Sequence, residues 1–356
     1  MFHPIFQISP KSSQALMDIE VSRQAVSRLS VSIQLLNSLR ESARLTSTHY
    51  STQIEGNRLT EAEVAVVAKG GTFPNRKRDE AEVKNYFMAL DYINGLITQD
   101  TRVLTIEMIQ TIHGCVMNGK AKPTSYRDGQ NVIRESGSGN IIYLPPEWRE
   151  VPQLMSELVE WVTVQLDESE LPAPIIAGIA HYQFATIHPY YDGNGRTARL
   201  LTNLILHLSG YGLKGIYSLE EYYARNLENY YSAISVGTSH NYHEGRAECD
   251  ISHWVEYFCQ GMADAFASVR IQAKKLQTKP DQTALLRELD MRQKRILNAF
   301  RESRYLTTKE IAEYLGVTPR TALTLCNTWV DSNFLVQHGE RRSRRYELVE
   351  AWTELL

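Results

Sequence analysis

The sequence has few cysteines, and their spacing excludes the metal and redox sites that cysteines usually build. Only four occur in 356 residues: Cys115, Cys249, Cys259 and Cys326. No two of them form a C-x-x-C pair or another metal-binding spacing. We therefore expect reduced thiols, which are typical of a cytoplasmic protein.

Long apolar runs and a secretory leader are also missing. No stretch approaches the roughly 20 apolar residues that a membrane span needs. The first residues, MFHPIFQISPKSSQ, lack a charged segment followed by an apolar core. We expect a soluble protein of the cytoplasm with no membrane partner.

Neither sign of charge is in clear excess. Lys and Arg number 38 and Asp and Glu number 41, a net charge of −3, which argues against a protein that coats nucleic acid along its whole length. Hydrophobic residues make up 43% and charged residues 22%, and this mixture excludes collagen-like and wholly disordered chains. At roughly 150 residues per domain, the length indicates two or three domains.

Helical patterns dominate the chain. Apolar residues recur at helical spacing over residues 24–45, 78–96, 152–166 and 174–186. The longest stretch without such a pattern is 126–148, where two β-branched runs, 131–133 and 141–144, flank Ser136-Gly137-Ser138-Gly139. This arrangement predicts a hairpin with a glycine-rich tip. The expected fold class is mainly α, with one β-hairpin.

The most informative stretch is HPYYDGNGRTAR, from His188 to Arg199. A helix is expected to end before Pro189, because the residue before a proline is disfavoured in the helical region. Asp-Gly-Asn-Gly then predicts a tight turn, and Arg196 to Ser209 a new helix. A glycine-bearing turn that leads into a helix N-terminus is an arrangement that binds anions.

The side chains of this stretch suit phosphate chemistry. Arg196 and Arg199 lie three residues apart in the first helical turn, where each can bind phosphate oxygens. Asp192 is an oxygen ligand that suits Mg²⁺, and His188 can accept a proton from an attacking hydroxyl. Each of these residues alone is more often structural. Their combination within twelve residues favours a phosphate-transfer site.

The stretch resembles the Fic domain, whose signature is H-P-F-x-[D/E]-G-N-G-R-x-x-R; Tyr190 replaces the usual Phe. The resemblance extends over roughly residues 50–260. It implies a Fic-type helical bundle in which the hairpin is a flap. It also implies a protein adenylyltransferase, which transfers AMP from ATP to a Ser, Thr or Tyr hydroxyl of a target protein and of itself, and releases pyrophosphate.

The resemblance implies a role for each motif residue. His188 would be the base, Asp192 the Mg²⁺ ligand, Arg196 the β-phosphate contact and Arg199 the γ-phosphate contact. The other nucleotide-binding residues would be Gly193, Asn194, Gly195, Thr197 and Ala198, with Tyr230 and Tyr231 on the adenine side. Taken alone, a tyrosine pair on a helix is more often packing. The flap residues Gly137, Ser138, Gly139 and Asn140 would pair with the target segment as an added strand.

A second motif, residues 51–57, lies upstream and reads STQIEGN. Taken alone it predicts a helix end with Gly-Asn as its C-cap. Beside a Fic core it resembles the inhibitory helix motif [S/T]-x-x-x-E-[G/N], here Ser51, Glu55 and Gly56. The resemblance implies that Glu55 pairs with Arg199, displaces the γ-phosphate and autoinhibits the enzyme. An inhibitory surface of this kind is compatible with a homodimer.

The composition changes near KKLQTKPDQT, which predicts a linker over 274–285. We expect an N-terminal helical region over 1–110, the Fic catalytic core over 111–273, and a C-terminal module over 286–356. The module resembles a winged helix-turn-helix, with helices over 308–315 and 319–330 and a basic wing tip at 341–345. Arg320 is the one charged residue in 319–330. DNA binding therefore stays open beside protein docking, which the low charge favours.

Other functions stay open as well. The chain could be a winged-helix transcriptional regulator whose Fic core senses a nucleotide, but the presence of His188 favours an enzyme. Within the resemblance, transfer of UMP or phosphocholine is an alternative, although the D-G-N-G-R-x-x-R arrangement favours ATP as donor. Glu55 could also orient a hydrolytic water, so that the enzyme removes AMP from its target.

Overall fold

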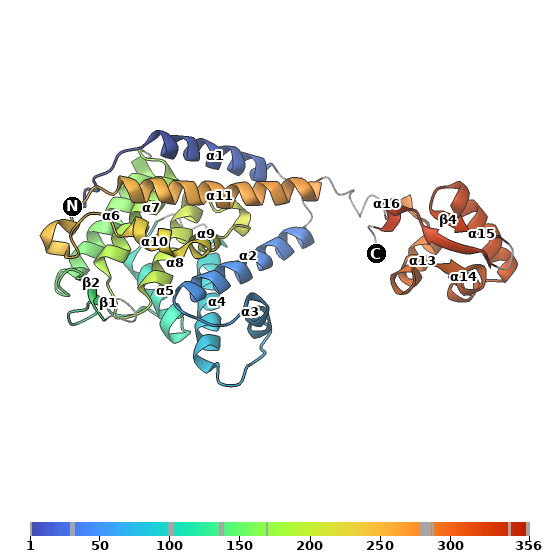
Figure 1. The fold of residues 1–356 in the computed structure, drawn as a ribbon, viewed down its shortest axis with the longest axis horizontal. Helices are drawn as coiled ribbons and strands as arrows, with labels where there is room; N and C mark the ends of the chain where they lie inside the picture. Colours follow the sequence, from blue (N-terminus) through green and yellow to red (C-terminus); the bar gives the residue numbers. More distant parts are fainter. Residues whose placement is uncertain are drawn as a thin grey trace. The chain divides into compact units, whose positions relative to one another are not determined.

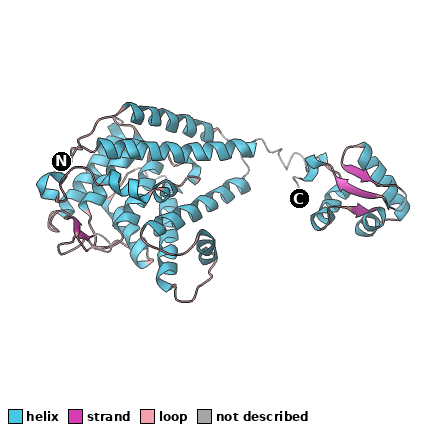
Figure 2. Ribbon diagram, in the orientation of Figure 1, coloured by secondary structure: helices cyan, strands magenta, loops and turns pink. Residues whose placement is uncertain are grey.

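The structure is a computed structural model of the chain, and it describes residues 2–28, 33–98, 103–134, 139–168, 170–277, 286, 288–340 and 343–353. These residues form two compact units, 1–273 and 274–356. Helices make up most of both units (Figures 1 and 2), as the sequence predicted. Of the predicted linker, residues 274–277 continue a helix of the first unit, and 278–285 lie outside the described residues.

The first unit is built from helices, with one short hairpin at its edge (Figure 1). In chain order its elements are α1 (Pro10–Ser27), α2 (Ile33–Ile54), α3 (Glu61–Ala68), α4 (Lys77–Thr98), α5 (Ile106–Asn118), β1 (Ile133–Arg134), β2 (Ile141–Tyr143), α6 (Val151–Glu168), α7 (Ala173–Ile187), α8 (Asn194–Leu208), η1 (Leu213–Gly215), α9 (Glu220–Arg225), α10 (Leu227–Ile234), η2 (Tyr242–Arg246) and α11 (Ser252–Gln277).

Helix α7 is the centre of this unit. All of its side chains except Ala173 and Ala185 are buried, as expected for a helix that is apolar on every side. It packs against α6 and α8. Helix α11 approaches it at Gly178, whose carbonyl accepts a hydrogen bond of 2.7 Å from the Trp254 indole. A Cβ at Gly178 would lie 2.7 Å from the Phe258 ring, so this close approach requires glycine.

The prediction of one helix over 24–45 is wrong. Helix α1 ends at Ser27, Arg28 is its C-cap, and α2 begins at Ile33. The Ser27 hydroxyl donates to the Gln24 carbonyl. Serine side chains compete for backbone hydrogen bonds and favour helix ends, which explains why α1 ends at Ser27 although the apolar periodicity continues.

The other predicted helices and the hairpin are present with shifted ends. Helix α4 continues beyond Gly95 to Thr98, and Thr105 caps α5 by accepting a hydrogen bond from the Met108 backbone. The hairpin strands pair antiparallel, with Ile133 opposite Tyr143. The first strand starts two residues later than predicted. Residues 135–138 of the glycine-rich tip, including Gly137 and Ser138, lie outside the described residues.

The second unit contains a three-stranded antiparallel sheet in the order β3-β5-β4. Its elements are α13 (Met291–Glu302), β3 (Leu306–Thr307), α14 (Thr308–Leu315), α15 (Pro319–Asp331), β4 (Leu335–His338), β5 (Arg345–Leu348) and α16 (Glu350–Thr353). The unit has a core of its own, centred on Ile296, Ile311, Cys326 and Tyr346. The interpretation of this unit as a winged helix stays a prediction, and Arg341 and Arg342 of the expected wing lie outside the described residues.

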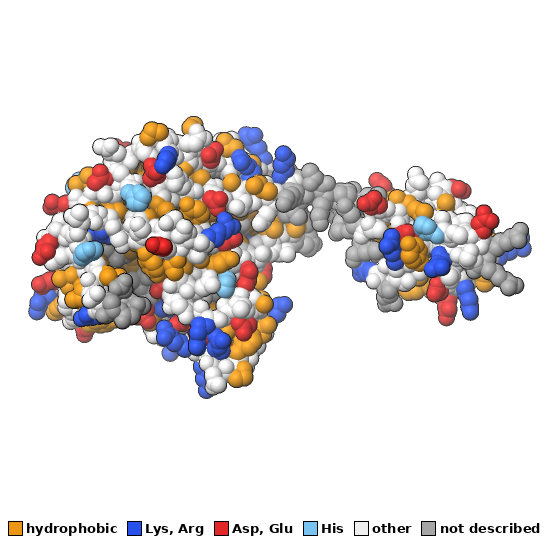
Figure 3. Space-filling model, viewed as in Figure 1, with side chains coloured by type: hydrophobic (Ala, Val, Ile, Leu, Met, Phe, Trp, Pro, Cys, Tyr) orange, Lys and Arg blue, Asp and Glu red, His pale blue; other side chains and the backbone are white. Residues whose placement is uncertain are grey.

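Charged side chains of both signs are scattered over the face of the molecule shown in Figure 3. None of the helices in the described part of the chain combines the length and the apolarity that crossing a lipid bilayer requires.

Candidate active site

The predicted motif forms the connection between α7 and α8. His188 is the C-cap of α7 and adopts a left-handed conformation with φ of 52°, which ends the helix before Pro189. The Asn194 side chain then closes the turn across Tyr190. Its oxygen accepts a hydrogen bond of 3.0 Å from the Tyr190 backbone N–H, and its amide donates over 2.8 Å to the Tyr190 carbonyl.

The first turn of helix α8 has no side-chain cap. The N-cap of the helix is Gly193, with φ of 77°. The first backbone N–H groups of a helix lack partners within the helix and carry partial positive charge, so an uncapped first turn suits an anion. A Cβ at Gly193 would lie 2.7 Å from the Met117 sulfur, which adds a packing reason for glycine.

Asp192 and Arg196 lie together at this helix end. Asp192 Oδ1 accepts hydrogen bonds from the Gly193 backbone at 2.6 Å and from Arg196 Nη2 at 3.3 Å. The Asp192 side chain is 61% exposed, whereas that of Arg196 is 5% exposed. An accessible carboxylate beside a buried guanidinium can contact a metal-bound phosphate from two sides.

Arg199 is buried and is held by the second motif. Its Nε donates to the Ser51 hydroxyl and its Nη2 to the Ser51 carbonyl, both over 2.8 Å. Nη2 also forms a salt bridge of 2.8 Å with Glu55 Oε1. Burial lowers the pKa of Arg199, but the Glu55 carboxylate, together with Tyr230 and Tyr86, more than offsets this effect and raises it. The contact that the sequence predicted between residues 55 and 199 is therefore present.

Glu55 is seated on the first turn of α8. A Cβ at Gly195 would lie 2.3 Å from Glu55 Oε1 and 3.2 Å from Arg199 Nη1. The carboxylate thus occupies space that only glycine leaves open, directly beside the arginine. A carboxylate at a helix N-terminus next to a guanidinium satisfies the same demands as a phosphate group would. Gly56, which follows it, has a φ of 89°.

His188 is in the protonation state that a general base needs. Burial lowers its pKa to about 4, and the nearby Arg127 charge contributes, although a hydrogen bond to the Ala185 backbone acts against them. The imidazole is therefore neutral near pH 7 and able to accept a proton.

Arg127 positions the motif, a role that the sequence pattern did not predict. It is 3% exposed, and its guanidinium donates to the carbonyls of His188 at 3.0 Å, of Gly129 at 3.1 Å, and of Pro146. Its backbone N–H donates to Pro189 over 2.9 Å. Arg127 lies 61 residues before His188 in a segment without regular structure, and no local pattern distinguishes it from a surface arginine.

His113 is a second positioning residue that the sequence did not reveal. Its ring is stacked on Tyr190, with centroids 3.5 Å apart and planes 4° apart. One ring nitrogen lies 2.7 Å from the Thr124 hydroxyl, and the other lies 3.0 Å from the Asp192 carbonyl. Burial lowers its pKa to about 4. A neutral His113 therefore fixes both the aromatic residue and the acidic residue of the motif.

The remaining predicted site residues differ in their surroundings. Tyr230 is buried and lies 3.0 Å from His181 Nε2, so it belongs to the core. Tyr231 is 47% exposed and donates a long hydrogen bond of 3.5 Å to the Ile54 carbonyl of α2. The side chains of Thr197 and Ala198 are fully buried. Gly139 and Asn140 lie at the described end of the hairpin, where the Gly139 carbonyl accepts from Arg134.

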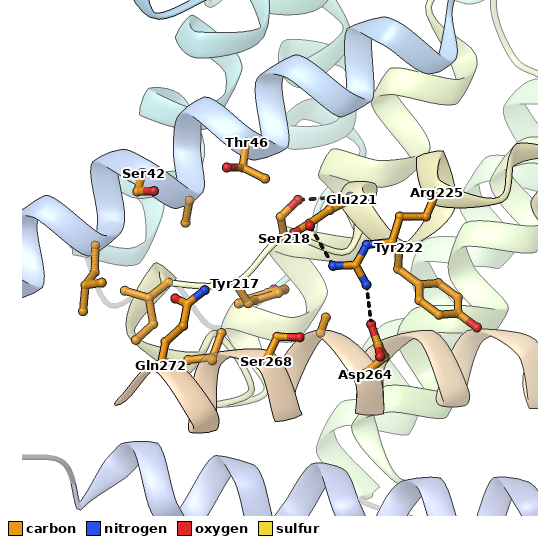
Figure 4. Close-up of a pocket in the computed structure, with 15 residues that line it drawn as sticks. Ser42, Thr46, Tyr217, Ser218, Glu221, Tyr222, Arg225, Asp264, Ser268 and Gln272 are labelled. Carbon is orange, nitrogen blue, oxygen red and sulfur yellow. Dashed lines mark hydrogen bonds and ion pairs between the residues drawn. The ribbon is translucent and has the colours of Figure 1, made fainter. Parts of the chain in front are cut away.

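A cavity of about 80 Å³ lies away from the motif, between α2, α9 and α11. Figure 4 shows Arg225 in it, bridging Glu221 and Asp264 at 2.7 Å and 3.2 Å, with Ser42 and Thr46 of α2 on its rim. Its lining contains no residue of 188–199. We place the candidate active site at the α7–α8 connection because the motif residues described above meet there.

Sequence comparisons find known proteins that are similar to this chain. The Fic/DOC family profile matches residues 103–206. The chain is 31% identical over 224 residues to protein adenylyltransferase fic-1 of Caenorhabditis elegans, covering 61% of this chain and 42% of that protein. It is 32% identical over 169 residues to protein adenylyltransferase Fic of Nematostella vectensis, covering 46% and 37%. The chain thus spans about two fifths of the length of these curated relatives.

Solved structures share the fold. A Fic family protein from Desulfovibrio desulfuricans superimposes with a TM-score of 0.70 at 20% identity, covering 98% of this chain and 99% of that one. Fic-1 of C. elegans superimposes with a TM-score of 0.59 at 23% identity, covering 75% and 74%. Residues 103–206 thus match the Fic/DOC family, and the chain has the fold of the solved Fic proteins.

Proposed function

We propose that this protein is a protein adenylyltransferase, which transfers AMP from ATP to a hydroxyl group of a target protein. The observation that carries the proposal is the convergence of His188, Asp192, Arg196 and Arg199 on the uncapped N-terminus of α8. Phosphoryl transfer requires such a set of groups: a base, an accessible carboxylate, two buried cations and free backbone N–H groups.

In the proposed reaction, His188 accepts the proton of the target hydroxyl. The hydroxyl oxygen attacks the α-phosphorus, a new P–O bond forms, and the bond to pyrophosphate breaks. A base with a pKa of about 4 is weak, so it would take the proton as the bond to phosphorus forms and not before. Arg127 and His113 keep this loop in place, and positioning supplies much of the rate in such transfers.

The remaining motif residues bind the phosphates. Arg196 contacts the β-phosphate, and Arg199 the γ-phosphate once Glu55 has left. Mg²⁺ would be held by Asp192, whose carboxylate is accessible, and it would neutralise charge on the phosphate oxygens. One protein carboxylate fits this ion, because Mg²⁺ at nucleotide sites is usually bound by one or two carboxylates together with phosphates and water.

Glu55 would inhibit the enzyme by occupying Arg199. The carboxylate repels a triphosphate and takes the position on α8 that a γ-phosphate would use. ATP that binds beside it would be held with its α-phosphate out of line with the attacking hydroxyl.

The test is labelling with α-³²P-ATP and Mg²⁺, with the chain itself and a cell lysate as acceptors. Glu55→Gly should label far faster than the wild-type chain. Adding His188→Ala to Glu55→Gly should abolish labelling, with a loss on the order of 10²–10⁴-fold, while ATP still binds in calorimetry. The matched control is Glu61→Gln, an exposed carboxylate at the start of α3. Equal labelling with and without His188 would disprove the proposed role.

A further inference from the structure

Asn57, the last residue of the motif over 51–57, is a buried asparagine that the proposed reaction does not use. It is 5% exposed and lies two residues after Glu55. Its amide nitrogen donates two hydrogen bonds of 2.9 Å, one to the Asp79 carbonyl and one to Glu82 Oε2. Its amide oxygen accepts a hydrogen bond of 3.1 Å from the Leu59 backbone. Both hydrogens of the amide therefore have an acceptor.

These hydrogen bonds join the end of α2 to the beginning of α4. Asp79 and Glu82, which supply the acceptors, lie in the first two turns of α4. Asp79 Oδ2 also forms a salt bridge of 3.0 Å with Arg58, the next residue after Asn57. The Arg58 side chain is mostly exposed, and an exposed ion pair contributes little. The buried amide of Asn57 therefore provides most of the polar attachment at this point.

A small hydrophobic cluster follows Asn57 in the chain. It joins the loop after α2 and helix α3 to α4, and it is separate from the large core of the first unit. Its buried members are Leu59, Val64, Val67, Val83 and Phe87. None of these five residues belongs to α8. The segment after Asn57 is therefore held on α4 independently of the contact between Glu55 and Arg199.

Glu55 lies between two attachments of the chain. On one side, the hydroxyl and the carbonyl of Ser51 accept hydrogen bonds of 2.8 Å from Arg199. On the other side, Asn57 is fixed on α4. Helix α2 ends at Ile54, and only Gly56 separates Glu55 from Asn57. The position of the Glu55 carboxylate therefore depends on the amide of Asn57 as well as on the helix before it.

The salt bridge alone would hold Glu55 only weakly. The Glu55 side chain is 29% exposed, and water competes for the exposed part of an ion pair. A triphosphate carries more negative charge than one carboxylate, so ATP competes strongly for Arg199. An attachment two residues away keeps the carboxylate at a high effective concentration beside the arginine. Asn57 thus opposes the displacement of Glu55 by the nucleotide.

We propose that Asn57 is a positioning residue: by joining the end of α2 to α4, it keeps Glu55 against Arg199 and so strengthens the inhibition. The inference rests on the proposed function, because it concerns the regulation of the same site. It predicts that the inhibition can be weakened without changing Glu55 or any residue of 188–199.

The decisive variant is Asn57→Asp. It keeps the size of the side chain and the acceptor for the Leu59 backbone, but it removes both donors and places a negative charge beside Glu82. Lost hydrogen bonds and like charges in a buried site favour release of Glu55 by roughly 5- to 30-fold. Self-labelling of the otherwise wild-type chain should rise by about that factor. The control is Asn94→Asp, the same change at an exposed asparagine of α4, which should leave labelling unchanged.

A second substitution can restore one hydrogen bond with donor and acceptor exchanged. In Glu82→Gln, the new amide can donate to the carboxylate that Asn57→Asp introduces. The double variant should therefore label more slowly than Asn57→Asp. Glu82→Gln alone keeps an acceptor for the Asn57 amide, so it should change labelling by less than about twofold. Labelling of the double variant as fast as that of Asn57→Asp would contradict the inference.

Combination with Glu55→Gly separates regulation from catalysis. Without Glu55 there is no inhibition left to release, so Asn57→Asp should change neither kcat nor the KM for ATP in that background. A rise of equal size in both backgrounds, or no rise in the wild-type background, would overturn the inference. If Glu55→Gly itself shows no labelling, the proposed function fails instead.

Hydrogen exchange gives a readout that is independent of activity. The backbone N–H groups of Glu55 and Gly56 donate to the carbonyls of Thr52 and Gln53 in the last turn of α2. These two amides should exchange faster in Asn57→Asp than in Asn94→Asp, because the chain end that follows them is no longer held. The amides of α7 should exchange at the same rate in both variants. Unaltered exchange at residues 55 and 56 would show that the amide of Asn57 does not hold this segment.

Discussion

At the scale of single residues, the catalytic loop depends on a side chain that does not belong to the motif. Arg127 donates to three carbonyls, among them that of His188, and lysine cannot reproduce this planar fork. In the Glu55→Gly background, Arg127→Lys should lower kcat on the order of 10²-fold, since small displacements of reacting groups cost that much. ATP affinity should change little. Steady-state labelling with varied ATP checks both values, and a kcat within about twofold would refute the positioning role.

Several buried histidines make the stability dependent on pH. Burial lowers the pKa values of His113, His188 and His207 from 6.5 to about 4. At pH values between these two pKa values, the unfolded chain binds more protons than the folded one. The free energy of unfolding therefore falls as the pH drops from about 6.5 towards 4. Each pK unit is worth about 1.4 kcal/mol, so one such histidine lowers stability by roughly 3 kcal/mol across this window.

Urea denaturation at several pH values between 4.5 and 7 measures this dependence. Most carboxylates remain ionised there, so histidines dominate the slope. His113→Gln, which cannot titrate, should show a shallower dependence than the wild-type chain. A flat profile for the wild-type chain would mean that these rings bind protons equally in the folded and the unfolded chain.

The sequence revealed those site residues that lie close together along the chain. Residues 188–199 form one loop and one helical turn, so their proximity follows from local structure. Glu55 could be assigned only through its resemblance to the inhibitory motif, because its partner lies 144 residues away. His113 and Arg127 could not be found, since ordinary residues acquire their roles only when distant segments meet. The burial of Tyr230 depends in the same way on His181.

At the scale of elements, the contact between α7 and α11 depends on one missing methyl group. Gly178→Ala gains about 1 kcal/mol of helix propensity, but its Cβ would lie 2.7 Å from the Phe258 ring. Overpacking a rigid core typically costs about 1–3 kcal/mol, so the variant should be less stable. Gly95→Ala in α4 is the matched control, because a Cβ there meets no atom within 4 Å. It should be neutral or slightly more stable.

Thermal unfolding of the two variants tests this comparison. A Gly178→Ala variant as stable as Gly95→Ala would show that α11 can move away at no cost.

Helices such as α7 were predictable from their apolar periodicity and caps. The end of α1 at Ser27 was not, because the apolar periodicity continues beyond it while the Ser27 hydroxyl bonds to the backbone.

At the scale of the whole molecule, the two units have separate hydrophobic cores. A chain ending at Gln277 should therefore keep its fold, and in the Glu55→Gly background it should keep its rate of self-labelling. If the second unit docks target proteins, its removal should change which lysate proteins are labelled. Gel analysis of labelled lysate, with circular dichroism of both chains as the folding control, gives the answer. Loss of self-labelling by a folded, truncated chain would contradict this independence.

The second unit also allows a test of DNA binding. If residues 286–356 bind DNA, the isolated unit should shift a duplex, and its affinity should fall steeply as salt is raised. A charge-reversed Arg320→Glu variant is the control for the helix over 319–331. No shift at low salt would leave protein docking as the remaining expectation.

The position of Glu55 ahead of Arg199 in the sequence has a consequence for synthesis. Chains grow from the N-terminus at about 5–20 residues per second, and 144 residues separate the two partners. Glu55 is therefore added to the growing chain roughly 7 to 30 seconds before Arg199. If Glu55 inhibits as proposed, the inhibitory residue is already present when the site is completed, so a newly made molecule need not pass through an uninhibited form.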